Sequence, residues 1–445
     1  MRLFVFVPGI LGSAMRQRHS PNGQIWPPGS VNAFQSRTFA QLTDDLGPDG
    51  VIQTICTQPI YSTITELFQA AGVAPLANGA KPDQALLNYA YDWRLNVQVE
   101  ADRLAGLLDA LTADGDEIVL LAHSMGGLLS RYLVEAERYA DRPFGRRLIK
   151  VVTINGVLLG APVMLARAMG LEATEFVVWA DTPRLLATPP LSGAYALAPA
   201  PGHARLFDGP TPIDIFDPYY YTALGFGLQN MREAAAVWAG VLGGAQRPNV
   251  DYVQISSRLD DASTIERVRY AAGTWTREYG PGDGTVPPWS SQGFANAETP
   301  DPLPGEHLGV IHSQGFRRLF SQYLAPLPAA AGGAALLLQP LKSHLRPGSV
   351  GEFSVLREGD APGSEGTLAW STVSDRGAKQ GPPVRVDSVA VPDQAAPLVR
   401  SRTPDTPGTY DVTLTLGAET ASARVAVRPA LDQGVLAPPP AAPPT

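Results

Sequence analysis

The sequence predicts an α/β domain built on a parallel sheet, followed by a small all-β domain. Over the first 325 residues, short apolar runs alternate with segments of helical periodicity, which is typical of a parallel sheet covered by helices on both faces. Beyond residue 334 the periodicity is two and turn residues separate short runs, which indicates a β-sandwich. The length of 445 residues is ample for both domains.

The first strand is expected at residues 3–7, where five consecutive apolar residues end at Pro8-Gly9. Further strands are expected at the apolar runs 51–57, 85–91, 118–121, 151–154 and 252–255. Helices are expected where apolar residues recur at intervals of three or four, at 60–71, 99–111, 128–136 and 312–323. This alternation predicts that the α/β domain ends near Ala325.

Between about residues 158 and 249 the pattern changes to Pro, Ala and aromatic residues. A stretch of this length without strand patterns predicts an insertion that caps the sheet. Its aromatic side chains are expected either to enclose an apolar ligand or to pack onto the sheet, and both interpretations stay open.

Residues 326–334 are a linker by composition, and residues 335–430 are expected to form the sandwich. Its strands are expected at 335–338, 350–356, 367–372, 384–391, 397–399, 409–416 and 420–427. The run Pro407-Gly408-Thr409-Tyr410 resembles the tyrosine-corner strand of immunoglobulin-like domains. The Pro-rich tail 431–445 is expected to be disordered.

Composition excludes several functions. Charged residues make up 17% of the chain and the net charge is −8, which argues against nucleic acid as a partner. The single cysteine, Cys56, allows no internal disulfide and no cysteine-based zinc site, and we expect it to be a small buried side chain. No cofactor and no metal are predicted.

Two features bear on localisation. The basic start and apolar run of residues 1–8 resemble a short signal peptide, but cleavage there would remove a loop that the chemistry below requires. A cytoplasmic protein is therefore expected, with non-classical export left open. The uncharged stretches 185–204 and 324–341 are broken by Pro and Gly, so neither predicts a transmembrane helix.

The strongest chemical signal is Ala122-His123-Ser124-Met125-Gly126-Gly127, where a buried strand stops at a serine that is followed by glycines and a helix. This is the pattern of a nucleophile elbow, in which the serine occupies a strained turn and the residues two before and two after it must be small. Ala122 and Gly126 meet that requirement. The alternative is that Ser124 only caps the next helix.

A serine nucleophile needs a histidine to take its proton and an acid to orient that histidine. In α/β-hydrolases the acid and then the histidine follow the serine along the chain. His307, in a polar loop, is preferred over His312, and the side chain of His123 is expected to point away. Asp283 is preferred because glycines flank it, with Asp260 and Asp261 as rivals and a plain turn aspartate as the alternative.

An oxyanion hole requires two backbone N–H groups. One is expected from Met125, directly after the nucleophile. The other is expected from Ile10, in the loop Pro8-Gly9-Ile10-Leu11-Gly12 that follows the first strand. The alternative for this loop is a simple Pro-Gly turn.

Several segments together resemble the lecithin:cholesterol acyltransferase family, which includes lysosomal phospholipase A and phospholipid:diacylglycerol acyltransferases. The matching segments run from Val7-Pro8-Gly9-Ile10-Leu11-Gly12-Ser13 through Tyr91-Asp92-Trp93-Arg94, the serine motif and Gly282-Asp283-Gly284-Thr285-Val286-Pro287 to Glu306-His307. The resemblance implies an α/β-hydrolase fold with a cap and the triad Ser124, Asp283 and His307, with oxyanion donors at Ile10 and Met125. The Tyr-Asp-Trp-Arg segment is interpreted as structural, with Arg94 pairing an acid.

The sequence departs from the family in two ways. Secreted animal members use disulfides, including one that shapes a membrane-touching loop, and the carboxy-terminal sandwich is not part of the shared core. A corresponding membrane surface is expected at residues 15–39, around Trp26.

The expected function is cleavage of lipid acyl esters through an acyl-serine, with water or an alcohol as acceptor. Substrate lipid and transient contact with a membrane or micelle surface are the expected partners. The alternative is a protein that binds through its sandwich, with a minor esterase activity on small esters. The oligomeric state is left open.

Overall fold

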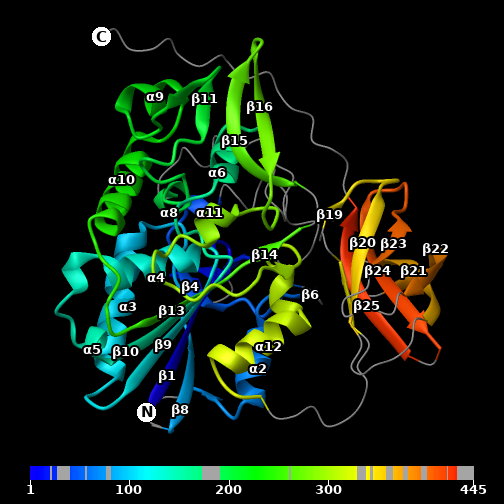
Figure 1. Cartoon of the computed structure of the whole chain (residues 1–445), viewed down its shortest axis with the longest axis horizontal. Helices are drawn as coiled ribbons and strands as arrows, with labels where there is room; N and C mark the ends of the chain where they lie inside the picture. The colour runs from blue at the N-terminus through cyan, green and yellow to red at the C-terminus, as the bar shows by residue number, and fades with distance from the viewer. Residues whose placement is uncertain are drawn as a thin grey trace.

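The computed structural model describes residues 1–20, 23–27, 41–55, 58–76, 82–172, 191–259, 262–327, 337–340, 344–356, 364–373, 379–391, 398–417 and 419–427. In Figure 1, a sheet with its helices forms the lower part of the molecule and a group of helices and short strands lies above it. The strands near the carboxyl end of the chain lie to one side. The order along the chain is therefore an α/β domain with a cap and then a β domain.

The α/β domain is built on a six-stranded parallel sheet in the order β13-β10-β9-β1-β8-β7. Its strands are β1 (Arg2–Val7), β7 (Ala74–Pro75), β8 (Gln84–Asn88), β9 (Glu117–His123), β10 (Leu148–Ile154) and β13 (Asp251–Ile255). In the centre, β1 and β9 are paired so that Val7 lies opposite Ala122. The segments that follow these two strands therefore meet at one edge of the sheet. The predicted strands 3–7, 85–91, 118–121, 151–154 and 252–255 are confirmed, with shifted ends.

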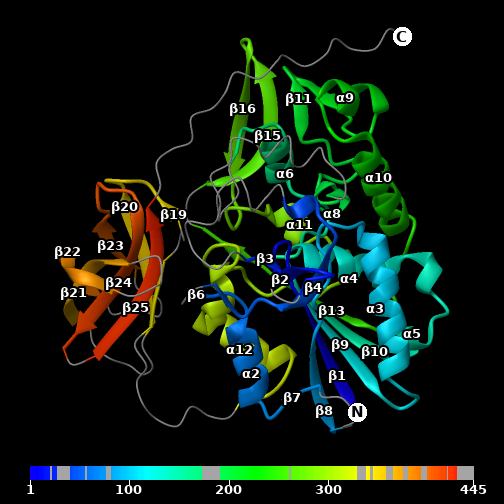
Figure 2. The ribbon, with the colours of Figure 1, turned by 180° about the vertical axis from the view of Figure 1, so that it is seen from behind.

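Helices cover both faces of this sheet (Figures 1 and 2). One face carries α2 (Ser62–Ala70) and α12 (Gln314–Tyr323), and the other carries α3 (Val97–Leu111), α4 (Met125–Glu135) and α5 (Pro143–Arg147). On the first face, the Phe68 ring lies 4.9 Å from Phe4 and 4.8 Å from Phe320, between centroids. Because both faces are covered, β1 is buried from Leu3 to Val7.

The last helix begins two residues later than predicted. The hydroxyl of Ser313 accepts the N–H of Phe316 at 2.9 Å and so caps α12 at its start. His312 instead ends the 3₁₀ helix η4 (Gly309–His312). The two other short helices of the domain are η3 (Glu137–Tyr139) and α11 (Pro288–Ser291).

The predicted strand 51–57 is wrong as a strand of the parallel sheet. β4 (Leu46–Val51) instead pairs antiparallel with β2 (Ser13–Gln17), which also pairs with β3 (Gln24–Trp26). β5 (Thr54–Ile55) and β6 (Gln58–Pro59) form a separate antiparallel pair, and η2 (Gln41–Thr43) precedes β4. A short apolar run indicates a half-buried strand but not its partner. Cys56 lies outside the described residues.

The predicted membrane surface around Trp26 is also wrong at its centre. The Trp26 side chain is completely buried, and its indole N–H donates to the carbonyl of Leu11 at 2.7 Å. Its ring lies 6.3 Å from that of Trp93. Trp26 is therefore a core residue that supports the first loop. Residues 28–40 lie outside the described ones.

The cap contains α6 (Pro162–Ala168), α8 (Ser192–Tyr195), α9 (Pro218–Ala223) and α10 (Leu228–Leu242). The prediction that it lacks strands is wrong, because β11 (Leu206–Asp208) and β12 (Thr211–Ile213) lie within it. β11 pairs with β15 (Thr264–Ala271), which forms a hairpin with β16 (Thr274–Gly280). The cap therefore extends beyond residue 249. Strands of three residues are too short to show a period of two.

The carboxy-terminal strands form two sheets with the orders β18-β20-β23 and β19-β25-β24-β21-β22. They are β18 (Leu337–Pro340), β19 (His344–Leu345), β20 (Val350–Leu356), β21 (Ser364–Val373), β22 (Lys379–Val391), β23 (Leu398–Arg402), β24 (Gly408–Leu416) and β25 (Glu419–Val427). Phe353, Trp370 and Tyr410 belong to a hydrophobic core separate from that of the α/β domain. β19 was not predicted, and β22 begins earlier than expected. Most of the predicted linker and the whole predicted tail lie outside the described residues.

Candidate active site

Ser124 lies in a sharp turn between β9 and α4, at the carboxyl edge of the sheet. Its φ of 54° is in the left-handed region, which is strained for a residue with a side chain. Its N–H donates to the carbonyl of Ile154 at 3.1 Å, which ties the turn to β10. A Cβ on Gly126 would lie 2.3 Å from the carbonyl oxygen of Val7. Only glycine fits there, which is the physical reason for the small residue in the motif.

His307 reaches Ser124 from a loop 183 residues further along the chain. Its Nε2 lies 2.8 Å from Ser124 Oγ, and its Nδ1 lies 2.7 Å from Asp283 Oδ2. Ser124, His307 and Asp283 are only 5%, 7% and 1% exposed, so water competes little for these hydrogen bonds. The structure thus brings together the three residues that the sequence predicts as nucleophile, base and acid.

Backbone groups hold the carboxylate of Asp283. Its Oδ1 accepts the N–H groups of Thr285 at 2.8 Å and Val286 at 2.6 Å, which leaves Oδ2 for His307. Gly282 has a φ of 150°, and a Cβ there would lie 2.5 Å from Thr264 Oγ1. The glycine before the aspartate therefore permits a close approach to β15, as the glycine-flanked motif indicated.

The loop that carries His307 is fixed through its own carbonyl. Asn155 Nδ2 donates to the His307 carbonyl at 2.9 Å, and His123 Nε2 lies 3.0 Å from the same oxygen. The N–H of His307 donates to the carbonyl of Asp283 at 2.9 Å. Asn155 directly follows β10 and has a φ of 46°, so its backbone is also in the left-handed region. Two polar side chains from neighbouring strands thus converge on one carbonyl.

His312, the alternative to His307, lies elsewhere. Its Nδ1 is 2.7 Å from the hydroxyl of Thr63 in α2. Burial lowers the pKa of its imidazole to about 4. The rival acids, Asp260 and Asp261, lie outside the described residues.

The predicted oxyanion donors lie beside the nucleophile. Met125 is the first residue of α4, and a Cβ on Gly9 would lie 3.3 Å from Ser124 Oγ, so the first loop approaches the serine at the residue before Ile10. Among the described residues, the N–H groups of Ile10 and Met125 have no hydrogen-bond acceptor. Both amides are therefore available to a ligand.

Sequence reasoning missed three polar residues that support the site: His123, Tyr61 and Asn155. The expectation that His123 points away is wrong, because its ring centroid lies 4.8 Å from that of His307. The Tyr61 hydroxyl lies 2.8 Å from His123 Nδ1. The adjacency of His123 to Ser124 was the only available signal, and it does not tell on which side of the strained turn the ring lies.

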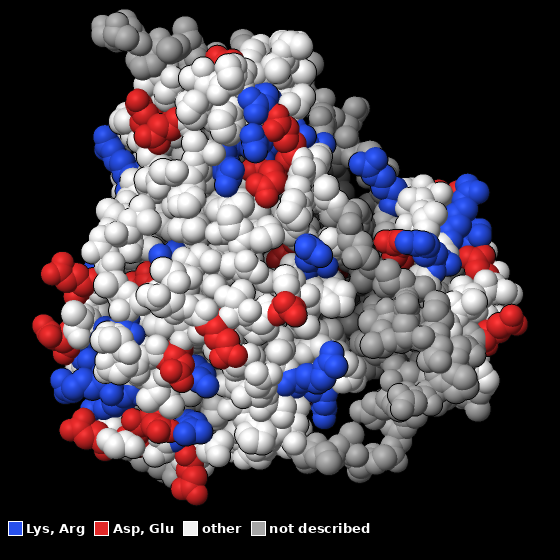
Figure 3. Space-filling model, in the orientation of Figure 1, with Lys and Arg blue, Asp and Glu red and all other residues white. Residues whose placement is uncertain are grey.

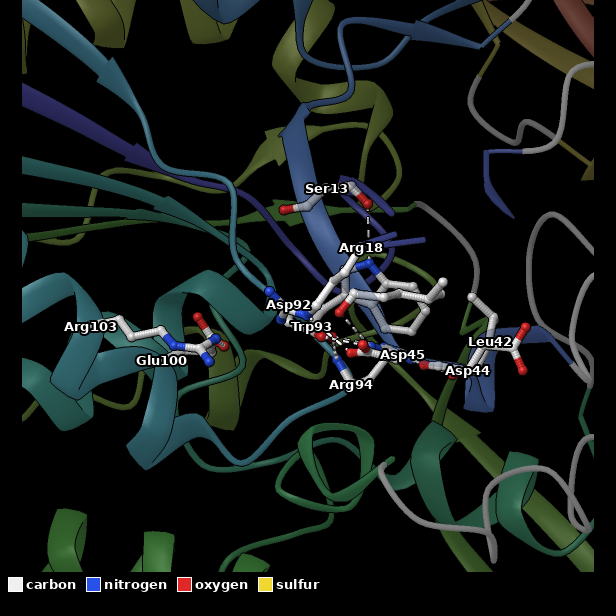
Figure 4. A network of polar contacts seen from close by, with 11 residues as sticks. Ser13, Arg18, Leu42, Asp44, Asp45, Asp92, Trp93, Arg94, Glu100 and Arg103 are labelled. Atoms are coloured by element: carbon white, nitrogen blue, oxygen red, sulfur yellow. Dashed lines mark hydrogen bonds and ion pairs between the residues drawn. The ribbon is translucent and has the colours of Figure 1, made fainter. Parts of the chain in front are cut away.

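The Tyr-Asp-Trp-Arg segment anchors the first loop. The Tyr91 hydroxyl donates to the carbonyl of Pro8 at 2.9 Å, and the Trp93 indole N–H donates to the carbonyl of Ser13 at 3.2 Å. Figure 4 shows Arg94 beside Asp92, and their side chains form two hydrogen bonds of 2.7 and 2.9 Å. The interpretation that Arg94 pairs an acid is confirmed, and the acid is Asp92.

Figure 3 shows charges of both signs over the β15–β16 hairpin, where Arg269 pairs with Glu278 and Arg277 with Glu172. Directly below the hairpin, the middle of this face is largely uncharged, and charged side chains of both signs gather again toward its lower left edge. Within the described ranges, no helix is long and apolar enough to cross a membrane. In the same part of the chain, no group of three or more His, Cys, Asp or Glu side chains is arranged to hold a metal ion.

The parallel sheet, the strained serine turn and the cap together define an α/β-hydrolase domain. Residues 53–176 match the family model of lecithin:cholesterol acyltransferase. This part of the α/β domain is therefore similar to the lecithin:cholesterol acyltransferase family. A search of the curated proteins found no match.

Three solved structures illustrate the structural similarities. The product of the gene lin2722 of Listeria innocua is 11% identical over 74% of this chain and 96% of that chain, with a TM-score of 0.32. The phospholipase PlaB of Legionella pneumophila, in complex with thio-NAD, is 11% identical over 98% of this chain and 91% of that chain, with a TM-score of 0.23. A cycloisomaltooligosaccharide glucanotransferase of Paenibacillus sp. is 18% identical over 22% of this chain, with a TM-score of 0.17. This chain spans 15% of the length of that enzyme.

Proposed function

We propose that the protein is a serine acyl hydrolase that cleaves lipid acyl esters through an acyl-serine intermediate and can pass the acyl group to an alcohol. The observation that carries the proposal is the chain of hydrogen bonds from Ser124 Oγ through the His307 ring to Asp283 Oδ2. A buried serine with a histidine at 2.8 Å, itself held by a buried acid, is the arrangement that nucleophilic catalysis needs.

Each group has a defined role in this proposal. A carboxylate oxygen can only accept, so His307 Nδ1 donates to Asp283 and Nε2 accepts the proton of Ser124. The serine oxygen then attacks the ester carbonyl, and the protonated imidazole returns the proton to the departing alcohol. Water or an acceptor alcohol releases the acyl group by the same steps in reverse order.

The oxyanion of the tetrahedral intermediate is stabilised by the N–H groups of Ile10 and Met125. Both donors lie next to Ser124 and are without an acceptor among the described residues. Met125 is also at the N-terminus of α4, whose dipole favours negative charge.

Two observations support a lipid ester over a small one. The first is the match of residues 53–176 to the lecithin:cholesterol acyltransferase model. The second is the position of the cap: a Cβ on Gly193 of α8 would lie 3.0 Å from Met125 Cε. The cap thus packs directly on the residue after the nucleophile. The cap also contains the aromatic pair Tyr195 and Phe226, whose ring centroids are 5.9 Å apart.

Replacing Ser124 by alanine tests the catalytic assignment. Ser124→Ala should remove nearly all turnover of a p-nitrophenyl ester, a loss on the order of 10⁶-fold in kcat. Ser130→Ala, in the same helix, is the matched control, because Ser130 is buried and its hydroxyl has no hydrogen-bond partner among the described residues. Near-normal turnover in folded Ser124→Ala protein contradicts the proposal.

The substrate class is tested with p-nitrophenyl esters of increasing acyl length. Each buried methylene contributes about 0.8 kcal/mol, so kcat/KM should rise about fourfold per carbon until the acyl site is full. A maximum at the acetyl ester would remove lipid from the proposal and leave the catalytic serine in place. Product analysis with labelled phosphatidylcholine, with and without an acceptor alcohol, distinguishes hydrolysis from transfer.

We further propose that the carboxy-terminal strands form an immunoglobulin-like sandwich. The support is the Tyr410 hydroxyl, which donates to the carbonyl of Thr406 at 2.8 Å, the backbone contact of a tyrosine corner. If the protein acts only by binding through this domain, the Ser124→Ala protein should retain that binding in full.

A further inference from the structure

A chain of hydrogen bonds behind the catalytic histidine connects two loops of the active site. The N–H of Gly9, in the first loop, donates to the Tyr61 hydroxyl at 3.0 Å. That hydroxyl lies 2.8 Å from His123 Nδ1. His123 Nε2 lies 3.0 Å from the carbonyl oxygen of His307. All of these contacts are buried.

The acceptors fix the direction of each hydrogen bond. The His307 carbonyl can only accept, so His123 Nε2 carries a proton and donates it. Burial holds the pKa of His123 well below its usual value, so the ring is neutral and Nδ1 is an acceptor. The Tyr61 hydroxyl therefore donates to Nδ1 and uses a lone pair for the N–H of Gly9. Every donor in this chain of hydrogen bonds therefore meets an acceptor.

We propose that Tyr61 and His123 are positioning residues that hold the first loop and the His307 loop at a fixed position relative to each other. Neither touches the reacting atoms. His123 directly precedes Ser124, so the chain of hydrogen bonds also includes the turn that carries the nucleophile. It thus connects the first loop, the Ser124 turn and the His307 loop. This inference rests on the proposed function for its kinetic test but not for its spectroscopic one.

The geometry explains why such a connection matters. Ile10 follows Gly9 directly, so a shift of Gly9 moves the proposed oxyanion donor, and a shift of the His307 carbonyl moves the ring that must reach Ser124. A misplacement of about 1 Å at reacting groups can lower a rate about 10²-fold. Asn155 also donates to the His307 carbonyl and keeps part of the restraint when His123 is replaced.

The kinetic test is Tyr61→Phe, which removes one oxygen and keeps the ring that packs 4.9 Å from Phe6. We expect kcat for a p-nitrophenyl ester to fall about 10- to 100-fold while KM changes little. The affinity of a trifluoromethyl ketone, which forms the oxyanion on Ser124, should fall by the same factor as kcat/KM.

The matched control is Tyr252→Phe. The Tyr252 hydroxyl also accepts a backbone N–H, that of Arg247 at 2.9 Å, and Tyr252 is also buried, but it lies in β13 away from the three loops. Thermal unfolding of the two variants shows whether each is folded. A kcat that falls equally in both, or that stays within about twofold of wild type in folded Tyr61→Phe, overturns the proposal.

His123 is tested with a conservative pair. Gln places its amide near the position of Nε2, so His123→Gln can still donate to the His307 carbonyl, whereas His123→Phe cannot. We expect the Gln variant to keep more kcat than the Phe variant. Equal activity of the two folded variants would contradict the role given to the donor.

The spectroscopic test needs no activity. In ¹⁵N-histidine-labelled protein, we expect His123 to be neutral with its proton on Nε2, and Tyr61→Phe should shift the signals of His123 and of His307. A His123 that is protonated on Nδ1, or a His307 that does not respond, overturns the inference. If the wild-type protein cleaves no ester but the spectra follow this pattern, the proposed function fails and the positioning network stands.

Discussion

Removing the Arg94 side chain should destabilise the α/β domain far more than removing an ordinary surface arginine. Arg94 is 2% exposed and its partner Asp92 is 1% exposed. Besides Asp92, the guanidinium donates to the carbonyls of Leu42 at 2.6 Å, Asp44 at 2.9 Å and Leu46 at 3.3 Å. In Figure 4, Leu42 and Asp44 lie on the side of Arg94 away from Glu100. One side chain therefore attaches the segment before β4 to the end of the Tyr-Asp-Trp-Arg segment.

The expected magnitude follows from burial. Breaking a buried ion pair by removing one partner costs about 3–5 kcal/mol, because the other charge is left buried without compensation. Arg94→Met also leaves three carbonyls without their donor, so we expect a loss of about 4 kcal/mol in the free energy of unfolding. The pair of Arg2 and Glu117 is the control, with side chains 44% and 43% exposed. Arg2→Met should cost less than about 1 kcal/mol.

The assay is urea unfolding of the full chain, followed by intrinsic fluorescence, for the single variants and for Asp92→Asn combined with Arg94→Met. Because the double variant leaves no buried charge, its loss should be smaller than the sum of the two single losses. If Arg94→Met unfolds at the same urea concentration as Arg2→Met, or if the losses at Asp92 and Arg94 simply add, the buried pair does not hold this segment.

Two further predictions concern the domains and the response to pH. A chain that ends at Ala325 should fold and keep activity on soluble esters, because the core of the α/β domain ends there and the carboxy-terminal core is separate; loss of soluble protein on truncation would contradict this. Burial raises the pKa of Glu100 to about 7. The stability that this group contributes is therefore complete below about pH 4.5 and is lost as the pH rises to 7. In Glu100→Gln, the free energy of unfolding should fall by about 3 kcal/mol less between pH 4.5 and pH 7 than in the wild-type protein. His312, with a pKa lowered to about 4, should act in the opposite direction, because its contribution is lost as the pH falls from 6.5 to 4, and His312→Gln should flatten that limb.

The sequence predicted those parts of the site that depend on local backbone geometry. Gly126 and Gly282 are constrained because a Cβ at either position would collide with neighbouring atoms, and both stand in recognisable motifs. Ser124 has to follow a buried strand, and β9 is readable as an uninterrupted apolar run. Features of this kind leave a mark within a few residues of the chain, so they can be found without knowing the fold.

Features that depend on long-range partners could not be predicted in the same way. The run 51–57 has the composition of a strand, but its antiparallel pairing with β2 depends on the course of the first loop. The cap strands β11 and β12 have three residues each and are stabilised by the β15–β16 hairpin. The hydrogen-bond partners of the His123 side chain are 62 and 184 residues away, at Tyr61 and His307.

The same contrast explains what the Tyr-Asp-Trp-Arg segment does. The first loop contains Leu11 in the left-handed region, with a φ of 64°, a conformation that persists only when its surroundings determine it. Tyr91 holds the Pro8 carbonyl, Trp26 holds the Leu11 carbonyl and Trp93 holds the Ser13 carbonyl, so donors from three aromatic side chains are spaced along the loop. Ile10 lies between the first two of these anchors, and its N–H is left without an acceptor among the described residues. In the proposed mechanism the segment therefore acts without contacting substrate, because it holds in place the strained loop that carries Ile10, the proposed oxyanion donor.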